Sequence, residues 1–308
     1  LGTTKHIVFA FKKLKENKRL YKRLNKTFPF VEIYLDPLNE YKITWHYPHT
    51  LRPETGQLIK KHFGNQSFIE SEQNKEFIGF LKASELYPEI KIRPEVKEKI
   101  ERAFETDMLE HLAQTEKLDL SPIKADLFPY QKEGVQFATF KRGAIIADEM
   151  GLGKTMQAFA VAIMKKQILG FQRTLIVCPA SLKSQWKKEI EKFTNENAEI
   201  IEGTPEERTI RYRKSPCFFL IVNYETVLRD QRAINRTDID FLILDEAQRV
   251  KNYATLTASA IKNLDRKHIL VITGTPIENR LIDIFSIMSI IDPHFLGLEA
   301  LPTFAPAS

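Results

Sequence analysis

A glycine-rich segment followed by a lysine and a threonine, residues 147–155 (ADEMGLGKT), has the composition of a phosphate-binding loop. Residues 143–147 read as a short buried strand and residues 156–165 as a helix, so the loop lies at a helix N-terminus. Backbone N–H groups and the helix dipole attract anions there, while Lys154 can reach the β- and γ-oxygens of a nucleotide and Thr155 can bind Mg²⁺. The nucleotide-binding residues predicted from this segment are Gly151, Gly153, Lys154 and Thr155.

The segment departs from the strict phosphate-loop pattern at one position. Asp148 stands where the pattern Gly-x-x-x-x-Gly-Lys-Thr has its first glycine. For this segment taken alone, an ordinary glycine-rich turn that caps a helix remains an alternative. The choice therefore depends on whether other residues suited to nucleotide chemistry follow along the chain.

Two adjacent carboxylates end a second buried strand. Residues 241–244 (FLIL) form a continuous apolar run, which is typical of a central parallel strand, and Asp245 and Glu246 follow it. Asp245 can bind Mg²⁺ directly or through water, and Glu246 can orient or deprotonate the water that attacks a γ-phosphate. The alternative is a pair of capping residues for the next helix. The position behind a Gly-Lys-Thr loop favours the catalytic interpretation.

These two motifs belong to a set of six that follow one another in a fixed order. The set comprises residues 127–135 (LFPYQKEGV), 148–155 (DEMGLGKT), 178–186 (CPASLKSQW), 222–226 (VNYET), 245–252 (DEAQRVKN) and 272–280 (ITGTPIENR). With these motifs, residues 121–300 resemble the Swi/Snf-type ATPases, a branch of the superfamily-two helicases that moves along double-stranded DNA. The sequence DEMGLGKT itself resembles the phosphate loop of this branch, which accounts for Asp148 at the position of the expected glycine.

The resemblance implies a role for each motif. The implied roles are an adenine contact for Gln131, DNA contacts for Ser181, Lys183, Thr273, Gly274 and Thr275, and coupling between nucleotide and DNA for Gln248 and Arg249. Simpler alternatives remain for several of these positions. Gln131 can be a polar residue in the first turn of a helix, and Thr-Gly-Thr-Pro suits any surface turn. For Trp186 we expect packing in the core or at its rim rather than base stacking.

Alternating strand and helix signals in residues 121–300 predict an α/β fold. The expected architecture is a RecA-like doubly wound parallel sheet, as in P-loop NTPases, with its ligand at the carboxyl edge of the strands. Strands are expected near residues 144–147, 174–178, 218–223, 241–244 and 268–273. A smaller α+β accessory region, residues 1–120, precedes this lobe, and residues 301–308 form a loose end.

The accessory region carries no motif of a known family. Residues 1–26 hold nine Lys or Arg residues against Glu16 alone, a balance of +8, which fits either a phosphate-binding helix or a solvated helix face. Residues 31–35 and 41–47 alternate apolar and polar side chains, which predicts a β-hairpin. Residues 95–114 read as a charged helix with apolar side chains at near-heptad spacing that should pack against another element. A linker, residues 118–126, follows.

Composition fits a protein of the cell interior. No apolar run reaches the roughly 18 residues that cross a membrane, and no signal-peptide pattern is present. Cys178 and Cys217 read as free thiols of a reducing compartment, and the histidines show no metal-ligand spacing with them. We therefore expect a DNA-associated protein in the cytoplasm, nucleoid or nucleus.

The expected activity is ATP hydrolysis stimulated by double-stranded DNA, which drives translocation along DNA or remodelling of a DNA-bound protein. ATP and Mg²⁺ are the expected cofactors. In the resembled family a second RecA-like lobe supplies an arginine finger, so we expect such a lobe further along the polypeptide and very slow hydrolysis by the 308-residue chain alone. Two alternatives stay open: a strand-separating or restriction-type helicase motor, and an ATP-binding interaction module that never hydrolyses ATP.

Overall fold

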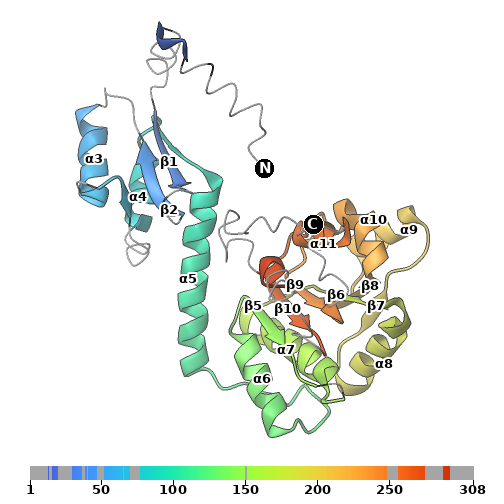
Figure 1. The fold of residues 1–308 in the computed structure, drawn as a ribbon. Helices are drawn as coiled ribbons and strands as arrows, with labels where there is room; N and C mark the ends of the chain where they lie inside the picture. The colour runs from blue at the N-terminus through green and yellow to red at the C-terminus, as the bar shows by residue number, and fades with distance from the viewer. Residues whose placement is uncertain are drawn as a thin grey trace, which may run out of the picture. The chain divides into compact units, whose positions relative to one another are not determined.

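The protein is described here by a computed structural model that divides into two compact units, Leu1–Asp107 and Met108–Ser308 (Figure 1). The described residues are 13, 16–19, 30–36, 39, 41–46, 52–64, 66–69, 77–149, 151–247, 256–274 and 287–291. Within this described part of the chain, no helix combines the length and the apolar character needed to cross a lipid bilayer.

The first unit contains a small sheet with the strand order β3-β2-β1-β4. Strands β1 (Val31–Asp36) and β2 (Lys42–His46) pair in antiparallel fashion, which confirms the predicted hairpin. Strand β3 (Phe68–Ile69) pairs antiparallel with β2, and β4 (Ile90–Ile92) pairs parallel with β1. The sequence pattern did not indicate β3 or β4, which are only two and three residues long.

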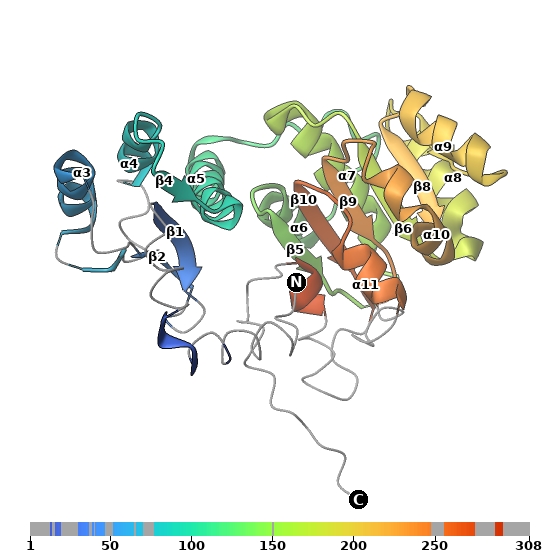
Figure 2. The ribbon, with the colours of Figure 1, turned by 90° about the horizontal axis from the view of Figure 1, so that it is seen from above.

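One face of this small sheet is covered by helices α3 (Pro53–Phe63) and α4 (Phe77–Ser84) and by the start of α5 (Pro94–Thr115) (Figure 2). Residues that pair directly across strands share a face, so Ile33 and Trp45 both turn toward these helices. The Trp45 ring packs edge-on against Phe63, with ring centroids 6.2 Å apart. Trp45 thus packs on the face of the sheet that the helices cover.

The predicted apolar stripe of α5 is buried at its start and exposed in the middle of the helix. Val96 and Ile100 enter the core of the first unit, whereas Phe104 and Met108 are exposed. The expectation that this stripe packs against another element therefore holds for Val96 and Ile100 and fails for Phe104 and Met108, whereas Leu109, further along the same helix, is 1% exposed.

The second unit contains a sheet of six parallel strands in the order β5-β10-β9-β6-β8-β7. The strands are β5 (Gly143–Ile146), β6 (Thr174–Cys178), β7 (Ala198–Ile200), β8 (Phe219–Asn223), β9 (Phe241–Leu244) and β10 (His268–Ile272). All except β7 coincide with strands predicted from the sequence. The predicted RecA-like parallel sheet is confirmed.

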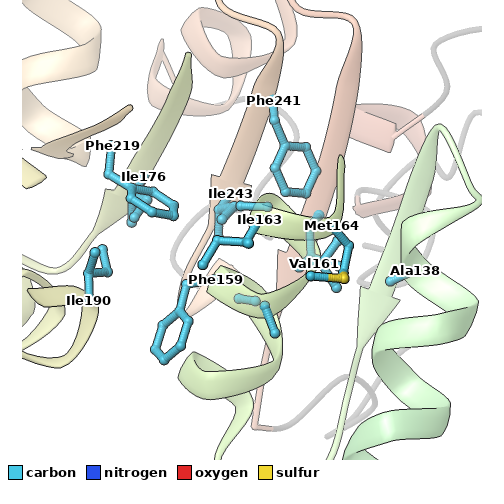
Figure 3. Packing of buried hydrophobic residues seen from close by; sticks show 14 of the residues in the cluster. Ala138, Phe159, Val161, Ile163, Met164, Ile176, Ile190, Phe219, Phe241 and Ile243 are labelled. Atoms are coloured by element: carbon cyan, nitrogen blue, oxygen red, sulfur yellow. The ribbon is translucent and has the colours of Figure 1, made fainter. Parts of the chain in front are cut away.

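Helices cover both faces of this sheet. Alternate residues of each strand point to opposite sides, and because both sets are apolar, both faces must be buried. Ile176 and Ile243 face one helix layer, made of α6 (Pro129–Thr139), α7 (Lys154–Leu169) and α8 (Lys183–Phe193), and Figure 3 shows them with Ile163 of α7. Leu175 and Val177 face the other layer. That layer consists of α9 (Pro205–Lys214), α10 (Tyr224–Ile234) and α11 (Leu256–Lys262).

Helix α7 is the most deeply buried helix near the phosphate loop, and it carries a buried cation. Lys165 is 1% exposed. Its Nζ donates hydrogen bonds to the carbonyl oxygens of Thr139 (2.7 Å) and Lys141 (2.9 Å), and Nδ1 of His268 lies 2.8 Å from it. A buried ammonium needs such partners to offset the loss of water. Lys165 therefore ties α7 to the end of α6 and to the start of β10.

Both cysteines are free thiols. Burial, with a further contribution from the charge of Asp245, raises the pKa of Cys178 to about 12, so this thiol stays protonated. Cys217 is partly exposed.

Candidate nucleotide-binding site

The order of the strands brings the predicted nucleotide-handling residues to one edge of the sheet. The loop of residues 147–153 follows β5, Asp245 follows β9, and β10 pairs with both of these strands. Because neighbouring strands lie about 4.8 Å apart, the two motifs are separated by roughly 10 Å. All three strands are parallel, so their carboxyl ends meet at the same edge, where ligands bind in this class of sheet.

The conformation of the loop depends on two glycines. Gly151 has a φ of 86° and Gly153 a φ of 72°, a region that L-residues with a side chain rarely adopt. Lys154 follows as the first residue of α7, and its Nζ donates hydrogen bonds to the carbonyl oxygens of Asp148 and Glu149, each at 2.8 Å. The ammonium group therefore lies against the loop backbone at the N-terminal end of the helix, where an anion would be attracted.

Helix α6 supports the loop from one side through Gln131. The Gln131 side chain accepts a hydrogen bond from the Phe128 N–H at 3.0 Å and donates one to the carbonyl oxygen of Leu152 at 3.1 Å. The Tyr130 hydroxyl donates to the same carbonyl at 3.1 Å. An amide side chain has two donor and two acceptor sites, so Gln131 keeps one of each for the adenine contact implied by the resemblance.

The position that departs from the strict phosphate-loop pattern is bonded to α7. Nε2 of Gln157 donates a hydrogen bond to Oδ2 of Asp148 at 2.7 Å, and Gln157 is 1% exposed. A Cβ atom at Gly134 of α6 would lie 2.3 Å from Oε1 of Gln157, so the two helices approach closely at this point. Asp148 therefore has a structural partner that a glycine would lack.

Asp245 is held on three sides at the end of β9. It is 7% exposed, and its Oδ2 accepts a hydrogen bond from the indole Nε1 of Trp186 at 2.8 Å. Its backbone N–H donates to the carbonyl oxygen of Val177 at 2.8 Å, and its carbonyl oxygen accepts from the Tyr224 hydroxyl at 2.6 Å. The carboxylate thus lies at a defined position beside β6, α8 and α10.

The electrostatic surroundings of Asp245 disfavour an isolated negative charge. Burial raises its pKa above the ordinary value, and the charge of Glu246 raises it further. The Trp186 hydrogen bond and the charge of Lys154 oppose this shift. Lys154 and Asp245, which are 91 positions apart in the sequence, therefore lie within electrostatic reach of each other.

Glu246 adopts a left-handed backbone conformation with a φ of 54°. For a residue with a side chain this conformation costs about 1–3 kcal/mol, and such strain is concentrated at functional sites. The strain here falls on the residue predicted to activate the attacking water. Gln248 and Arg249, the predicted coupling residues, lie outside the described residues.

The predicted DNA contacts differ in their accessibility. Ser181 is exposed in a 3-10 turn (Ala180–Leu182) after β6, and Lys183 begins α8 with its Nζ paired to the carboxylate of Glu202. Thr273 is fully buried, with its N–H bonded to the carbonyl oxygen of Ile146 at 3.2 Å. Gly274 is partly exposed. Thr275 lies outside the described residues.

Sequence reasoning missed several residues that hold this site in place. Gln157 and Tyr224 were given no role, and Trp186 was expected only to pack in the core or at its rim. Trp186 is buried, as expected, but its indole N–H bonds to Asp245. The available signal was general: a tryptophan or tyrosine in a core has one polar atom, and that atom usually finds a partner.

The residues present fit a nucleotide with Mg²⁺. This cation prefers oxygen ligands, which the Asp245 carboxylate and the Thr155 hydroxyl can supply. A cation would also relieve the burial of Asp245 and its repulsion by Glu246. Lys154 and the N-terminal end of α7 provide the positive charge that phosphates require.

The chain is similar in sequence to known proteins. A family model described as the SNF2-related domain matches residues 67–305. The chain is 33% identical over 192 residues to the DNA repair and recombination protein RAD54B of Gallus gallus, covering 57% of the chain and 21% of that protein. It is 31% identical over 198 residues to the TATA-binding protein-associated factor MOT1 of Saccharomyces cerevisiae, covering 58% of the chain and 11% of that protein.

A solved structure shows the same fold. The chain matches the SWI2/SNF2 ATPase core of Sulfolobus solfataricus in complex with double-stranded DNA at 34% identity and a TM-score of 0.54. The match covers 59% of this chain and 39% of that one. The chain spans about a fifth or less of the two curated relatives named above.

Proposed function

Because the chain belongs to the SNF2-related domain family, we propose that residues 121–300 form the ATP-binding lobe of a motor that hydrolyses ATP when it is bound to double-stranded DNA. One observation carries this proposal. Lys154 of the phosphate loop and the buried Asp245 lie at the carboxyl edge of one parallel sheet, close enough for the charge of the lysine to oppose the rise in the pKa of the carboxylate.

Each residue of the site has a task in this proposal. Lys154 exchanges the two loop carbonyl oxygens for the β- and γ-oxygens of ATP, and Gly151 and Gly153 keep the loop backbone open to the phosphates. Thr155 and Asp245 hold Mg²⁺, which supplies charge neutralisation at the phosphates. Gln131 contacts the adenine with the donor and acceptor that its backbone contacts leave available.

Glu246 prepares the attacking water. It follows Asp245 directly, so its carboxylate belongs to the same strand end as the metal-binding group. A carboxylate at this position can accept the proton of the water as the bond to the γ-phosphate forms. The left-handed backbone conformation of Glu246 sets the direction in which its side chain leaves the backbone.

Movement along DNA, or remodelling of a DNA-bound protein, is the proposed output. The solved relative is a complex with double-stranded DNA, and one curated relative is named as a TATA-binding protein-associated factor. In this chain the proposed phosphate contacts are Ser181 and Lys183, and the DNA phosphate would replace Glu202 as the partner of Lys183. Thr273, Gly274 and Thr275, together with Gln248 and Arg249, would couple these contacts to the nucleotide.

A second RecA-like lobe and its arginine finger complete the proposed motor, because Lys154 and Mg²⁺ supply only part of the positive charge that phosphoryl transfer needs. An arginine finger contributes about 10³ to 10⁵ in rate. We propose that the motor acts inside the cell, on DNA in the cytoplasm, nucleoid or nucleus.

Steady-state phosphate release tests this function. We expect the 308-residue chain to bind Mg·ATP and to hydrolyse it very slowly, and a longer version with a second lobe to show turnover that rises with double-stranded DNA. Fast turnover by the short chain would contradict the need for a second lobe and would point to Arg249 or Arg280. If the longer version binds ATP without hydrolysing it, the protein is instead an ATP-binding interaction module.

A second assay separates translocation from strand separation. A motor that moves along intact duplex DNA displaces a third strand bound in the groove and leaves the duplex paired. We expect ATP-dependent displacement of the third strand without separation of the duplex. Release of a single strand from a partial duplex would instead indicate an unwinding helicase.

A further inference from the structure

We propose that Trp186 is a positioning residue for the nucleotide site: its indole N–H fixes the Asp245 carboxylate in the orientation that receives Mg²⁺. This inference rests on the proposed function, in which Asp245 is a metal ligand. It assigns a task to a tryptophan for which the sequence predicted only packing, in the core or at its rim.

The contact joins two buried groups. Nε1 of Trp186 lies 2.8 Å from Oδ2 of Asp245, and the two residues are 1% and 7% exposed. Water has little access to this hydrogen bond, so the carboxylate cannot simply exchange the indole for solvent. A hydrogen bond to a charged acceptor in such surroundings is stronger than one between neutral groups.

The Asp245 carboxylate is held by two hydrogen-bond donors, the indole N–H of Trp186 and the backbone N–H of Glu246. Oδ2 faces the indole of Trp186 on α8, and the backbone of Asp245 is fixed by Val177 and Tyr224. With the backbone and one carboxylate oxygen held, rotation of the side chain is restricted, and Oδ1 keeps a defined direction. Loss of a group that orients a metal ligand in this way typically lowers metal affinity by about 10- to 100-fold.

Trp186 is also the point at which α8 is bonded to the end of β9. It lies three positions after Lys183, the first residue of that helix, whereas Asp245 belongs to the strand end that carries the catalytic carboxylates. Packing alone would explain the burial of the indole, because Trp186 belongs to the core cluster that contains Phe159 and Ile190. If Trp186 served packing alone, its N–H group would make no difference to the nucleotide site.

An isosteric replacement separates the two explanations. In 3-benzothienylalanine a sulfur atom replaces the indole N–H, so the ring keeps its shape and loses only its donor. The same replacement at Trp45 is the control: Trp45 also donates its N–H, to the carbonyl oxygen of Gln66 at 2.9 Å, but it belongs to the core of the first unit. Thermal unfolding of both variants checks that the fold is kept.

The readout is the affinity for ATP by calorimetry, once with EDTA and once with saturating Mg²⁺. With EDTA we expect all three proteins to bind ATP equally. The gain in affinity produced by Mg²⁺ should fall by about 10- to 100-fold in the Trp186 variant, the usual effect of removing a group that orients a metal ligand. It should be unchanged in the Trp45 variant. A full gain in the Trp186 variant would overturn the inference.

A double-mutant cycle adds a second test of the same contact. If Trp186 acts through Asp245, the effects of Trp186→Phe and Asp245→Asn on the Mg²⁺-dependent gain should not add, because both changes remove one interaction. Additive effects would contradict the inference. The two proposals fail differently. A wild-type chain without any Mg²⁺-dependent gain overturns the proposed function and this inference together, whereas a normal gain in both wild type and the Trp186 variant overturns this inference alone.

Discussion

Gln157 donates a 2.7 Å hydrogen bond from its side-chain amide to the carboxylate of Asp148, which joins the start of the phosphate loop to the first turns of α7. Asp148 is the residue that stands in place of the first glycine of the strict phosphate-loop pattern. The departure is therefore part of the structure of this loop, because the carboxylate gives a buried amide the acceptor it needs.

Asp148→Ala tests this relationship. The change leaves the buried Gln157 amide without its acceptor, so we expect the free energy of unfolding to fall by about 1–3 kcal/mol. Asp148→Asn is the matched control, since its side-chain oxygen can still accept the hydrogen bond. Urea unfolding measures both. Equal losses in the two variants would show that the charge of Asp148, rather than the hydrogen bond, is what matters.

Gly153→Ala should damage the loop more than Gly151→Ala. Both glycines have a positive φ, so an alanine at either position carries backbone strain of about 1–2 kcal/mol. A Cβ atom at Gly153 would in addition lie 2.4 Å from Nε2 of Gln131, whereas one at Gly151 meets nothing within 4 Å. Urea unfolding and ATP affinity should both show the difference. Indistinguishable variants would mean that Gln131 moves aside without cost.

Glu246→Gln should separate binding from hydrolysis. The side chain keeps its size and loses its ability to accept a proton, so ATP affinity should stay close to that of the wild type. Turnover in a version with a second lobe should fall by about 10² to 10⁴, the usual contribution of a general base. Calorimetry and phosphate release measure the two quantities. Full turnover would remove Glu246 from its assigned role.

The basic segment of residues 1–26 is predicted to add DNA affinity that does not depend on sequence. Its few described residues, 13 and 16–19, are exposed. Each phosphate neutralised by a lysine or arginine makes binding more dependent on salt, so deleting residues 1–26 should weaken DNA binding and flatten the plot of log affinity against log salt concentration. Fluorescence anisotropy with duplex DNA measures this slope. The same slope after deletion would identify the segment as a solvated helix face.

The sequence identified the elements that are long and strongly patterned. Strands such as β6, β9 and β10 are buried on both faces, and parallel strands of this kind leave continuous apolar runs in the sequence. Strand β7 was missed because it is three residues long, contains Glu199 and lies at the edge of the sheet. Strands β3 and β4, of two and three residues, form by pairing with the hairpin, and no local sequence pattern indicates such pairing.

In the candidate site, too, some residues could be predicted from the sequence and others could not. Lys154, Asp245 and Glu246 could be found from their types and spacing, because the chemistry of phosphates and Mg²⁺ requires those groups. The contacts of Trp186 and Gln157 could not, because each depends on which strands are neighbours and on how closely two helices approach. The burial of Thr273 likewise follows from the position of β10 between β5 and β9.

Lys154 is the group that binds the nucleotide phosphates in the proposed function. Calorimetric titration of the 308-residue chain with Mg·ATP tests it, with Lys154→Ala as the variant. The control is Lys166→Ala, which removes the same charge from the same helix at a position about 18 Å along its axis.

We expect the wild-type and Lys166→Ala proteins to bind Mg·ATP with equal affinity. Lys154→Ala should bind at least about ten-fold more weakly, because it loses charge-assisted hydrogen bonds to the phosphates. Equal affinity of the wild-type and Lys154→Ala proteins would contradict the assignment of this loop, and with it the central claim that the chain is an ATP-binding lobe.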